Sequence, residues 1–75
     1  MTNHPTIKWT LHLDLPRGVQ ENSDKVYVET ISLFGAVFEG FNAMDGTEYI
    51  SVRITKFNEK KEWAIIRNPN LAKPD

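Results

Sequence analysis

The residues best suited to acid–base chemistry in this 75-residue chain are His12, Asp14 and Ser51. His12 and Asp14 stand two apart in an alternating segment, so their side chains share one face of a predicted strand. A serine on the same sheet face would complete a nominal triad. A working triad also needs an oriented base and oxyanion donors, and polar residues alternating along an exposed strand produce such sets routinely. We therefore expect no enzyme activity and no catalytic residue.

Metal and phosphate chemistry have equally weak signals. His4, His12 and Asp14 lack the spacing of a metal-binding motif, and the chain has no cysteine. Gly35 and Gly40 stand alone, without the Lys-Ser/Thr pair of a phosphate-binding loop. We expect neither metal nor cofactor. A secreted domain of this size would usually carry disulfides, so the absence of cysteine favours a cytoplasmic location.

The composition is that of a small globular domain. Nine Lys and Arg residues face ten Asp and Glu residues, which excludes the strongly basic profile of many nucleic-acid-binding proteins. The hydrophobic fraction of 40% is near the globular average, and no apolar run approaches the ~18 residues of a membrane span. We expect a single domain over residues 1–75, with an ordered core at about 6–69, loose termini and no membrane contact.

The segments that must position any functional side chains are mainly strands. Residues 7–15 alternate apolar and polar side chains, and residues 47–57 do the same after an Asp-Gly turn signal. Residues 25–29 and 62–67 are shorter β-rich segments, and the polar residues 58–61 connect two strands at hairpin length. Four strands are therefore predicted.

Residues 30–44 predict a helix, beginning near a Thr30 or Ser32 cap. Its expected core-facing side is Ile31, Phe34, Val37, Phe38 and Phe41, with Ser32, Ala36 and Glu39 opposite. On this interpretation Phe34→Ala or Phe38→Ala would cost about 3–5 kcal/mol. Gly35→Ala would stabilise the helix by roughly 1 kcal/mol at most.

These elements predict an α+β fold: a four-stranded, mainly antiparallel sheet with one helix packed on one face, in the order ββαββ. The alternative is an all-β small barrel in which residues 30–44 form a bulged strand with kinks at the glycines. The alternation also leaves one face of the sheet open. It does not decide which face of residues 62–67 is buried.

Aromatic and basic residues gather on the predicted open face and at the following hairpin. Such side chains dominate protein–protein interfaces and also stack unpaired bases. Residues 46–75 hold six of the nine basic residues, so this end of the chain is the more basic one. The candidate partner contacts are Tyr27, Tyr49, Arg53, Phe57, Lys60, Lys61, Trp63 and Arg67.

We therefore expect a small non-catalytic protein-binding module, namely a regulator, adaptor or inhibitor of the kind that phages and other mobile elements encode. It would dock this face onto a larger protein partner. Homodimerisation through an edge strand or the open sheet face is a further route. The alternative function is weak single-stranded nucleic-acid binding on the same face, which would weaken steeply as salt rises.

Overall fold

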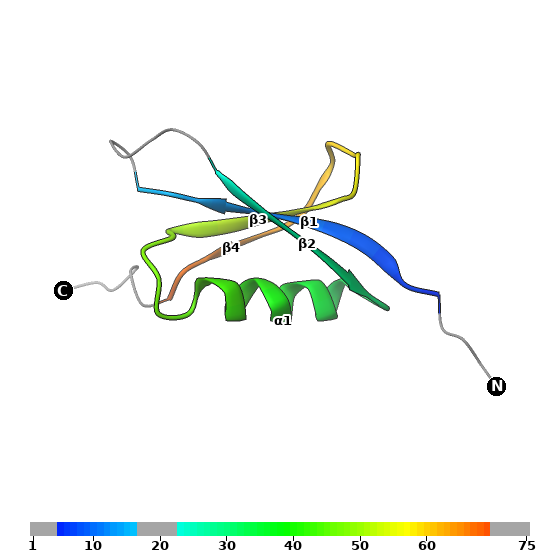
Figure 1. Cartoon of the computed structure of the whole chain (residues 1–75), viewed down its shortest axis with the longest axis horizontal. Coiled ribbons are helices and arrows are strands. Elements are labelled where there is room, and N and C mark those ends of the chain that lie inside the picture. The colour runs from blue at the N-terminus through cyan, green and yellow to red at the C-terminus, as the bar shows by residue number, and fades with distance from the viewer. Residues whose placement is uncertain (1–4, 17–22, 70–75) are drawn as a thin grey trace.

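The computed structural model describes residues 5–16 and 23–69, which form one sheet and one helix (Figure 1). The strands are β1 (Ile7–Asp14), β2 (Asp24–Thr30), β3 (Ser51–Lys56) and β4 (Glu62–Arg67), and the helix is α1 (Leu33–Met44). The four strands pair antiparallel in the spatial order β2-β1-β3-β4, and α1 covers one face. The predicted α+β fold is confirmed. The sheet is open, with β2 and β4 at its edges, so the barrel alternative is wrong.

The alternating segment β1 is the centre of the sheet. It pairs with β2 on one side and with β3 on the other, so that Leu11 lies opposite both Val26 and Ile54. Because cross-strand partners share a face, these side chains all point toward the helix layer. The chain leaves β2 on one side of β1, passes through α1 and returns as β3 on the other side.

The core lies between the inner face of the sheet and α1. Trp9 is 1% exposed, and its indole Nε1 donates a hydrogen bond of 2.8 Å to Thr30 Oγ1. Bulky side chains of β1 and β3 fill most of this layer, while the helix contributes small residues and one methionine. The buried apolar residues are Trp9, Leu11, Leu13, Ala36, Met44, Val52 and Ile54.

The helix begins and ends where the sequence predicts, but it is rotated about its own axis relative to the predicted orientation. Of the predicted core-facing residues, Val37 does pack against the core. Ser32 caps the first turn by accepting a hydrogen bond from the Gly35 amide at 3.4 Å. The residues that face the sheet are Ala36, Gly40 and Met44. Phe34, Phe38 and Phe41, predicted to lie in the core, are instead 85%, 64% and 43% exposed. Ile31, just before the helix, is also exposed.

Close approach of the helix to the sheet explains this orientation. A Cβ atom on Gly40 would lie only 3.0 Å from Val52 Cγ1, so a bulky side chain at this position has no room. Trp9 already fills much of the inner layer. The large loss expected for Phe34→Ala and Phe38→Ala is therefore wrong, because both rings are already mostly in solvent.

A bulge in the β3–β4 pairing decides the orientation of β4. Ile54 pairs with Ala64, but Thr55 pairs with Glu62, so Trp63 is the extra residue of the bulge. The Trp63 ring packs edge-on against Trp9 on the helix side, with ring centroids 6.2 Å apart. Beyond the bulge, Ala64 and Ile66 pack against the core, which places Ile65 and Arg67 on the opposite, open face.

Candidate interaction surface

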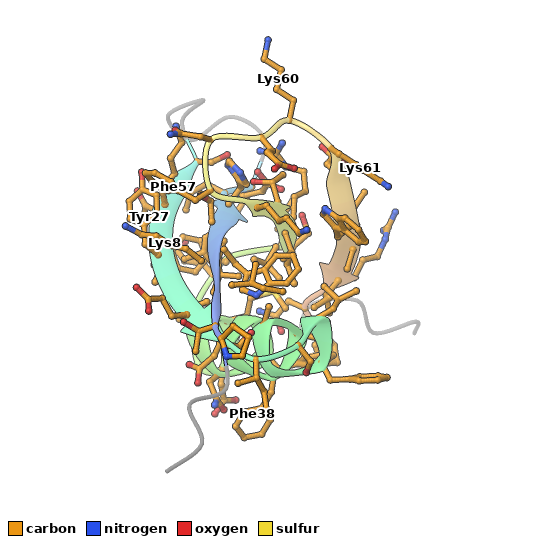
Figure 2. The ribbon with its side chains drawn as sticks, turned by 90° about the vertical axis from the view of Figure 1, so that its right-hand side faces the viewer. Lys8, Tyr27, Phe38, Phe57, Lys60 and Lys61 are labelled. Carbon is orange, nitrogen blue, oxygen red and sulfur yellow. The ribbon has the colours of Figure 1, made fainter. Side chains whose placement is uncertain are left out.

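The open face of the sheet carries a group of one lysine and two aromatic rings, here called the aromatic cluster: Lys8, Tyr27 and Phe57. The Tyr27 and Phe57 rings meet edge to face at 5.6 Å, and both are exposed. The Lys8 ammonium lies 4.3 Å from the Phe57 centroid and 5.7 Å from that of Tyr27 (Figure 2). Each side chain comes from a different segment: Lys8 from β1, Tyr27 from β2, and Phe57 from just after β3.

Beside the aromatic cluster the sheet has a hollow of about 310 Å³, here called the sheet hollow. Thr10 and Thr55 pair across β1 and β3, and both side chains are buried. We attribute the hollow to this pair of small side chains, which stands among larger neighbours. Its lining residues are Thr10, His12, Lys25, Tyr27, Thr55, Phe57, Asn58, Glu59 and Lys60.

Lysines outnumber carboxylates around the sheet hollow and the aromatic cluster. Lys25 and Lys60 line the hollow and Lys8 stands over the adjoining rings, whereas Glu59 lies in the lining and Glu29 is the cross-strand partner of Lys8. Figure 2 shows Lys60 at the tip of the β3–β4 hairpin, pointing away from the rest of the molecule. An occupant that combines an apolar or aromatic group with negative charge would complement this part of the surface.

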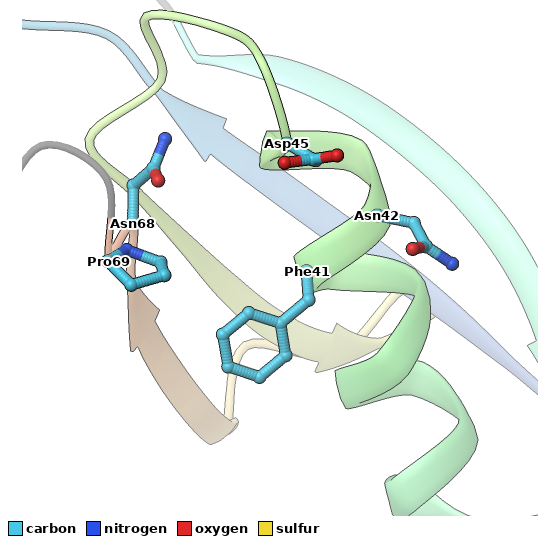
Figure 3. Close-up of a pocket in the computed structure, with 5 residues that line it drawn as sticks. All are labelled: Phe41, Asn42, Asp45, Asn68 and Pro69. Atoms are coloured by element: carbon cyan, nitrogen blue, oxygen red, sulfur yellow. The ribbon is translucent and has the colours of Figure 1, made fainter.

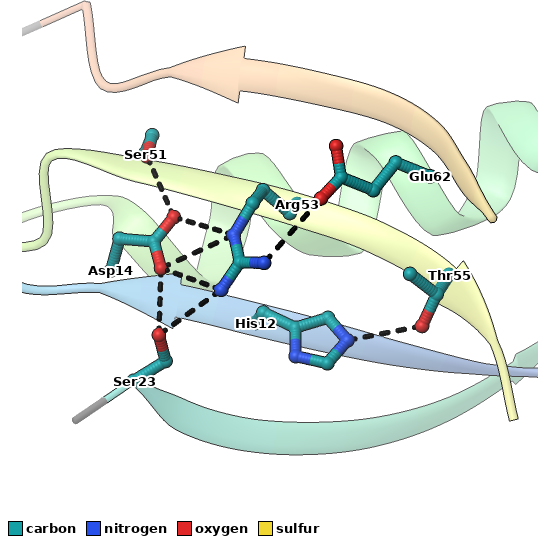
Figure 4. Close-up of polar contacts among 7 residues, drawn as sticks. All are labelled: His12, Asp14, Ser23, Ser51, Arg53, Thr55 and Glu62. Carbon is teal, nitrogen blue, oxygen red and sulfur yellow. Dashed lines mark hydrogen bonds and ion pairs between the residues drawn. The ribbon is translucent and has the colours of Figure 1, made fainter. Parts of the chain in front are cut away.

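The other half of the open face is a polar network centred on Asp14 (Figure 4). Arg53 donates to both carboxylate oxygens of Asp14, with its Nε and Nη2 atoms each at 3.0 Å. Ser23 and Ser51 donate to the same carboxylate at 2.7 and 3.0 Å. Burial alone would raise the pKa of Asp14, but the hydrogen bonds from Arg53, Ser23 and Ser51 hold it below its ordinary value.

This network changes the role expected of Arg53. Its Nη1 atom also lies 3.5 Å from Glu62, so two carboxylates of this same chain, Asp14 and Glu62, already pair with the Arg53 guanidinium. A partner that used Arg53 would have to displace them. We therefore assign Arg53 to the organisation of the open face, where it links β3 to the ends of β1 and β4.

The nominal triad is not assembled. Ser51 donates to Asp14, whereas His12 Nε2 lies 3.0 Å from Thr55 Oγ1, so the imidazole is paired with a different hydroxyl. Within residues 5–16 and 23–69, no three His, Cys, Asp or Glu side chains gather as a metal site would require. His4 lies outside the described residues.

We expect His12 to make the stability of the fold dependent on pH. Desolvation, followed by the positive charges of Arg53 and Lys25, lowers the pKa of His12 below 6.5, against the opposing effects of Asp14 and Glu62. The unfolded chain therefore binds this proton more readily than the folded chain. Above pH 6.5 the imidazole is neutral in both states, whereas below pH 6.5 its protonation favours the unfolded chain, so the free energy of unfolding falls. We expect the urea midpoint to fall between about pH 7.5 and about pH 5.

The control for this pH effect is His12→Gln, which keeps a hydrogen-bonding group near Thr55 but cannot titrate. Its urea midpoint should vary less over the same pH range, which lies above the titration range of Asp14. An equal pH dependence in both proteins would show that another group is responsible.

The structure separates the predicted contacts into two sets. Tyr27, Phe57 and Lys60 belong to the aromatic cluster or the sheet hollow, and Arg67 lies opposite Ser51 on the open face. Trp63 and Lys61 are on the helix side, where the Lys61 ammonium lies 4.3 Å from the Trp63 centroid. Figure 2 shows Lys61 directed away from Lys60.

Tyr49 also differs from its predicted position on the open face. The strand β3 begins only at Ser51, so the alternation does not fix Tyr49. Its side chain packs against the core, and its hydroxyl donates to Asp24, whose cross-strand partner is the buried Leu13. Tyr49 therefore ties the segment before β3 to the start of β2.

One structural residue could not be identified from the sequence. Asn68 is buried, and its Nδ2 donates to the Tyr49 carbonyl at 2.8 Å and to the Met44 carbonyl at 3.3 Å, which joins the end of α1 to the entry of β3. A small hollow of about 220 Å³ lies beside it, lined by Phe41, Asn42, Asp45, Asn68 and Pro69 (Figure 3). An asparagine next to a proline looks like an ordinary turn signal, so nothing in the pattern marks it as buried.

Comparison with known protein families, curated proteins and solved structures finds no match to this chain. In the described part of the chain, no helix has the length and hydrophobicity needed to cross a bilayer. The functional argument therefore rests on the aromatic cluster and the sheet hollow.

Proposed function

We propose that this chain is a small non-catalytic protein-binding module that docks the open face of its sheet onto a larger, acidic protein in the cytoplasm. The observation that carries the proposal is the sheet hollow with the aromatic cluster at its edge. Two exposed rings, a surrounding set of lysines and a floor of small buried residues form a preformed receptor for one apolar or aromatic side chain.

The preorganisation of this surface supports binding. The Lys8 ammonium already lies over the rings, and Tyr27 projects from a paired strand, so little side-chain freedom remains to be lost. The neighbouring Asp14–Arg53 network fixes the other half of the face without exposing an unpaired carboxylate at Asp14. A regulator, adaptor or inhibitor needs such a fixed surface and no cofactor.

Affinity capture from the native host tests the proposal with three baits: wild type, Tyr27→Ser with Phe57→Ser, and Trp63→Ser. The last variant removes a partly exposed ring that lies on the helix side, outside the sheet hollow, and serves as the control. The partner should be retained by wild type and Trp63→Ser and lost by the double variant. For the purified partner, loss of both rings should raise the Kd at least tenfold. Equal retention by all three folded baits would refute the proposal.

Single-stranded nucleic acid is the second candidate occupant of the same face. The stacked cation and the two exposed rings favour it, because a base could stack there while phosphates meet Lys25 and Lys60. This interaction would be weak, because Glu59 lies among the lysines.

Two neighbouring lysines distinguish the nucleic-acid function. Lys60→Glu should weaken binding of a random-sequence RNA oligomer several-fold, because Lys60 lines the sheet hollow. Lys61→Glu makes the same charge change on the helix side and should have a smaller effect. Fluorescence anisotropy at low and at raised salt measures both, and affinity should fall steeply with salt. Binding that is absent at low salt, or insensitive to salt and to Lys60→Glu, would leave the protein partner as the function.

A further inference from the structure

The outer face of α1 carries an apolar row that the sheet-face function does not use. This row, here called the helix stripe, consists of Phe34, Phe38 and Phe41, and Ile31 continues it beyond the start of the helix. Figure 2 shows Phe38 pointing away from the sheet, on the far side of the helix. Because a phenylalanine side chain has roughly 200 Å² of surface, the stripe and Ile31 expose on the order of 500 Å². A patch of this size is among the largest that monomeric proteins expose, and such patches are often binding sites.

We propose that the helix stripe is the contact between two copies of this chain, packed as an antiparallel helix pair about a two-fold axis. The spacing of the stripe is self-complementary. Phe34 and Phe41 lie equally far from the point midway between Val37 and Phe38, so a two-fold axis at that point places Phe34 of one copy opposite Phe41 of the other. Phe38 of each copy then lies beside the axis.

The charges at the ends of the helix favour the antiparallel arrangement. Asp45 follows the last turn, where its carboxylate is unfavourable beside the negative end of the helix dipole. The first turn has no acidic residue to complement its positive end. In the antiparallel pair, Asp45 of each copy lies close to the first turn of the other helix, which relieves both mismatches.

The stripe has few charges that would oppose the pairing. Glu39 is the charged residue within α1, and it lies about 100° around the helix from Phe38, toward the edge of the stripe. Two copies would together bury on the order of 1,000 Å², at the lower end of specific interfaces. The dimer is therefore expected to be a reversible one, with dissociation observable in solution.

Sedimentation equilibrium of the full chain from about 10 µM to about 1 mM tests this inference, a range suited to an interface of modest area. The wild-type mass should rise with concentration toward twice the 8.6 kDa of the monomer. Phe38→Glu should raise the dissociation constant at least tenfold, because it places a charge beside the axis. Ile65→Glu is the matched control, since it makes the same change at an exposed residue on the open sheet face, and it should leave dimerisation intact.

Asp45→Lys tests the orientation. It should weaken the dimer several-fold while leaving the monomer at least as stable, because a cation suits the end of its own helix and the cap hydrogen bonds come from the backbone. Unchanged affinity would overturn the antiparallel arrangement. Amide shifts that move with concentration at residues 34, 38 and 41, and not at Tyr27, would support the stripe as the contact.

Two further results would overturn the inference. A wild-type protein that keeps the monomer mass up to about 1 mM would exclude a second copy as the occupant of the stripe. A dimer that survives Phe38→Glu but is lost in Ile65→Glu would assign self-association to the sheet face instead. Neither result would refute the proposed function, because that function depends on capture through Tyr27 and Phe57.

Discussion

Replacing Trp9 by alanine should cost about 3–5 kcal/mol of unfolding free energy. The indole is 1% exposed in the inner layer, donates to Thr30 and contacts the Trp63 ring. Its loss would leave a cavity in a layer that the close-packed helix cannot easily fill. A domain of this size has a total stability on the order of 4–11 kcal/mol, so this substitution would remove a large fraction of it.

Urea denaturation followed by far-UV circular dichroism measures the Trp9 effect. Trp63→Ala is the control, because Trp63 contacts the same ring but is itself 39% exposed, and its loss should cost about 1 kcal/mol. A Trp9→Ala protein that lost no more stability than the Trp63→Ala protein would contradict the described core.

Replacing Gly35 by alanine should destabilise the protein by about 1–3 kcal/mol, opposite in sign to the expectation from helix propensity. A Cβ atom at Gly35 would lie 2.8 Å from Thr30 Cβ. Thr30 cannot move away freely, because its hydroxyl donates to the Ser32 carbonyl at 2.6 Å and accepts from Trp9. The steric conflict therefore exceeds the gain in backbone entropy.

The control for Gly35→Ala is Asn42→Ala, at an exposed site on the same helix. This substitution should be neutral or stabilise by a few tenths of a kcal/mol, since alanine is the better helix former. Thermal unfolding of both variants beside the wild type gives the comparison. If Gly35→Ala raised the melting temperature as much as Asn42→Ala, the close contact with Thr30 would be absent in solution.

The strands could be predicted because the alternation of apolar and polar residues that marks a strand is contained within the strand itself. The alternation of β1 fixes Trp9, Leu11 and Leu13 on one face whatever lies around them. The side of α1 that meets the sheet could not be predicted in this way. Ala36, Gly40 and Met44 line up along one side of a helix just as the aromatic row does along another, and only the distance between helix and sheet decides which side is buried.

The candidate surface shows the same limit. Tyr27 and Phe57 were placed on the open face by alternation, and the structure confirms that position. Trp63, a predicted contact, lies on the helix side instead, because it is the extra residue of the bulge in the β3–β4 pairing. Tyr49 precedes the strand whose pattern was extended to include it. Neither the bulge at Trp63 nor the exact start of β3 can be recognised from a single sequence.

The separation of the molecule into two layers has a consequence for how strongly a target could be held. The helix stripe and the sheet hollow lie on opposite layers, so a pair of chains joined through their helices would present two hollows facing outward. Such a pair is bivalent. On a target that repeats its binding site at a matching distance, the second contact would form at millimolar effective concentration, which can raise the overall avidity 10²–10⁴-fold. On a target with a single site, the second hollow would stay free to recruit another molecule.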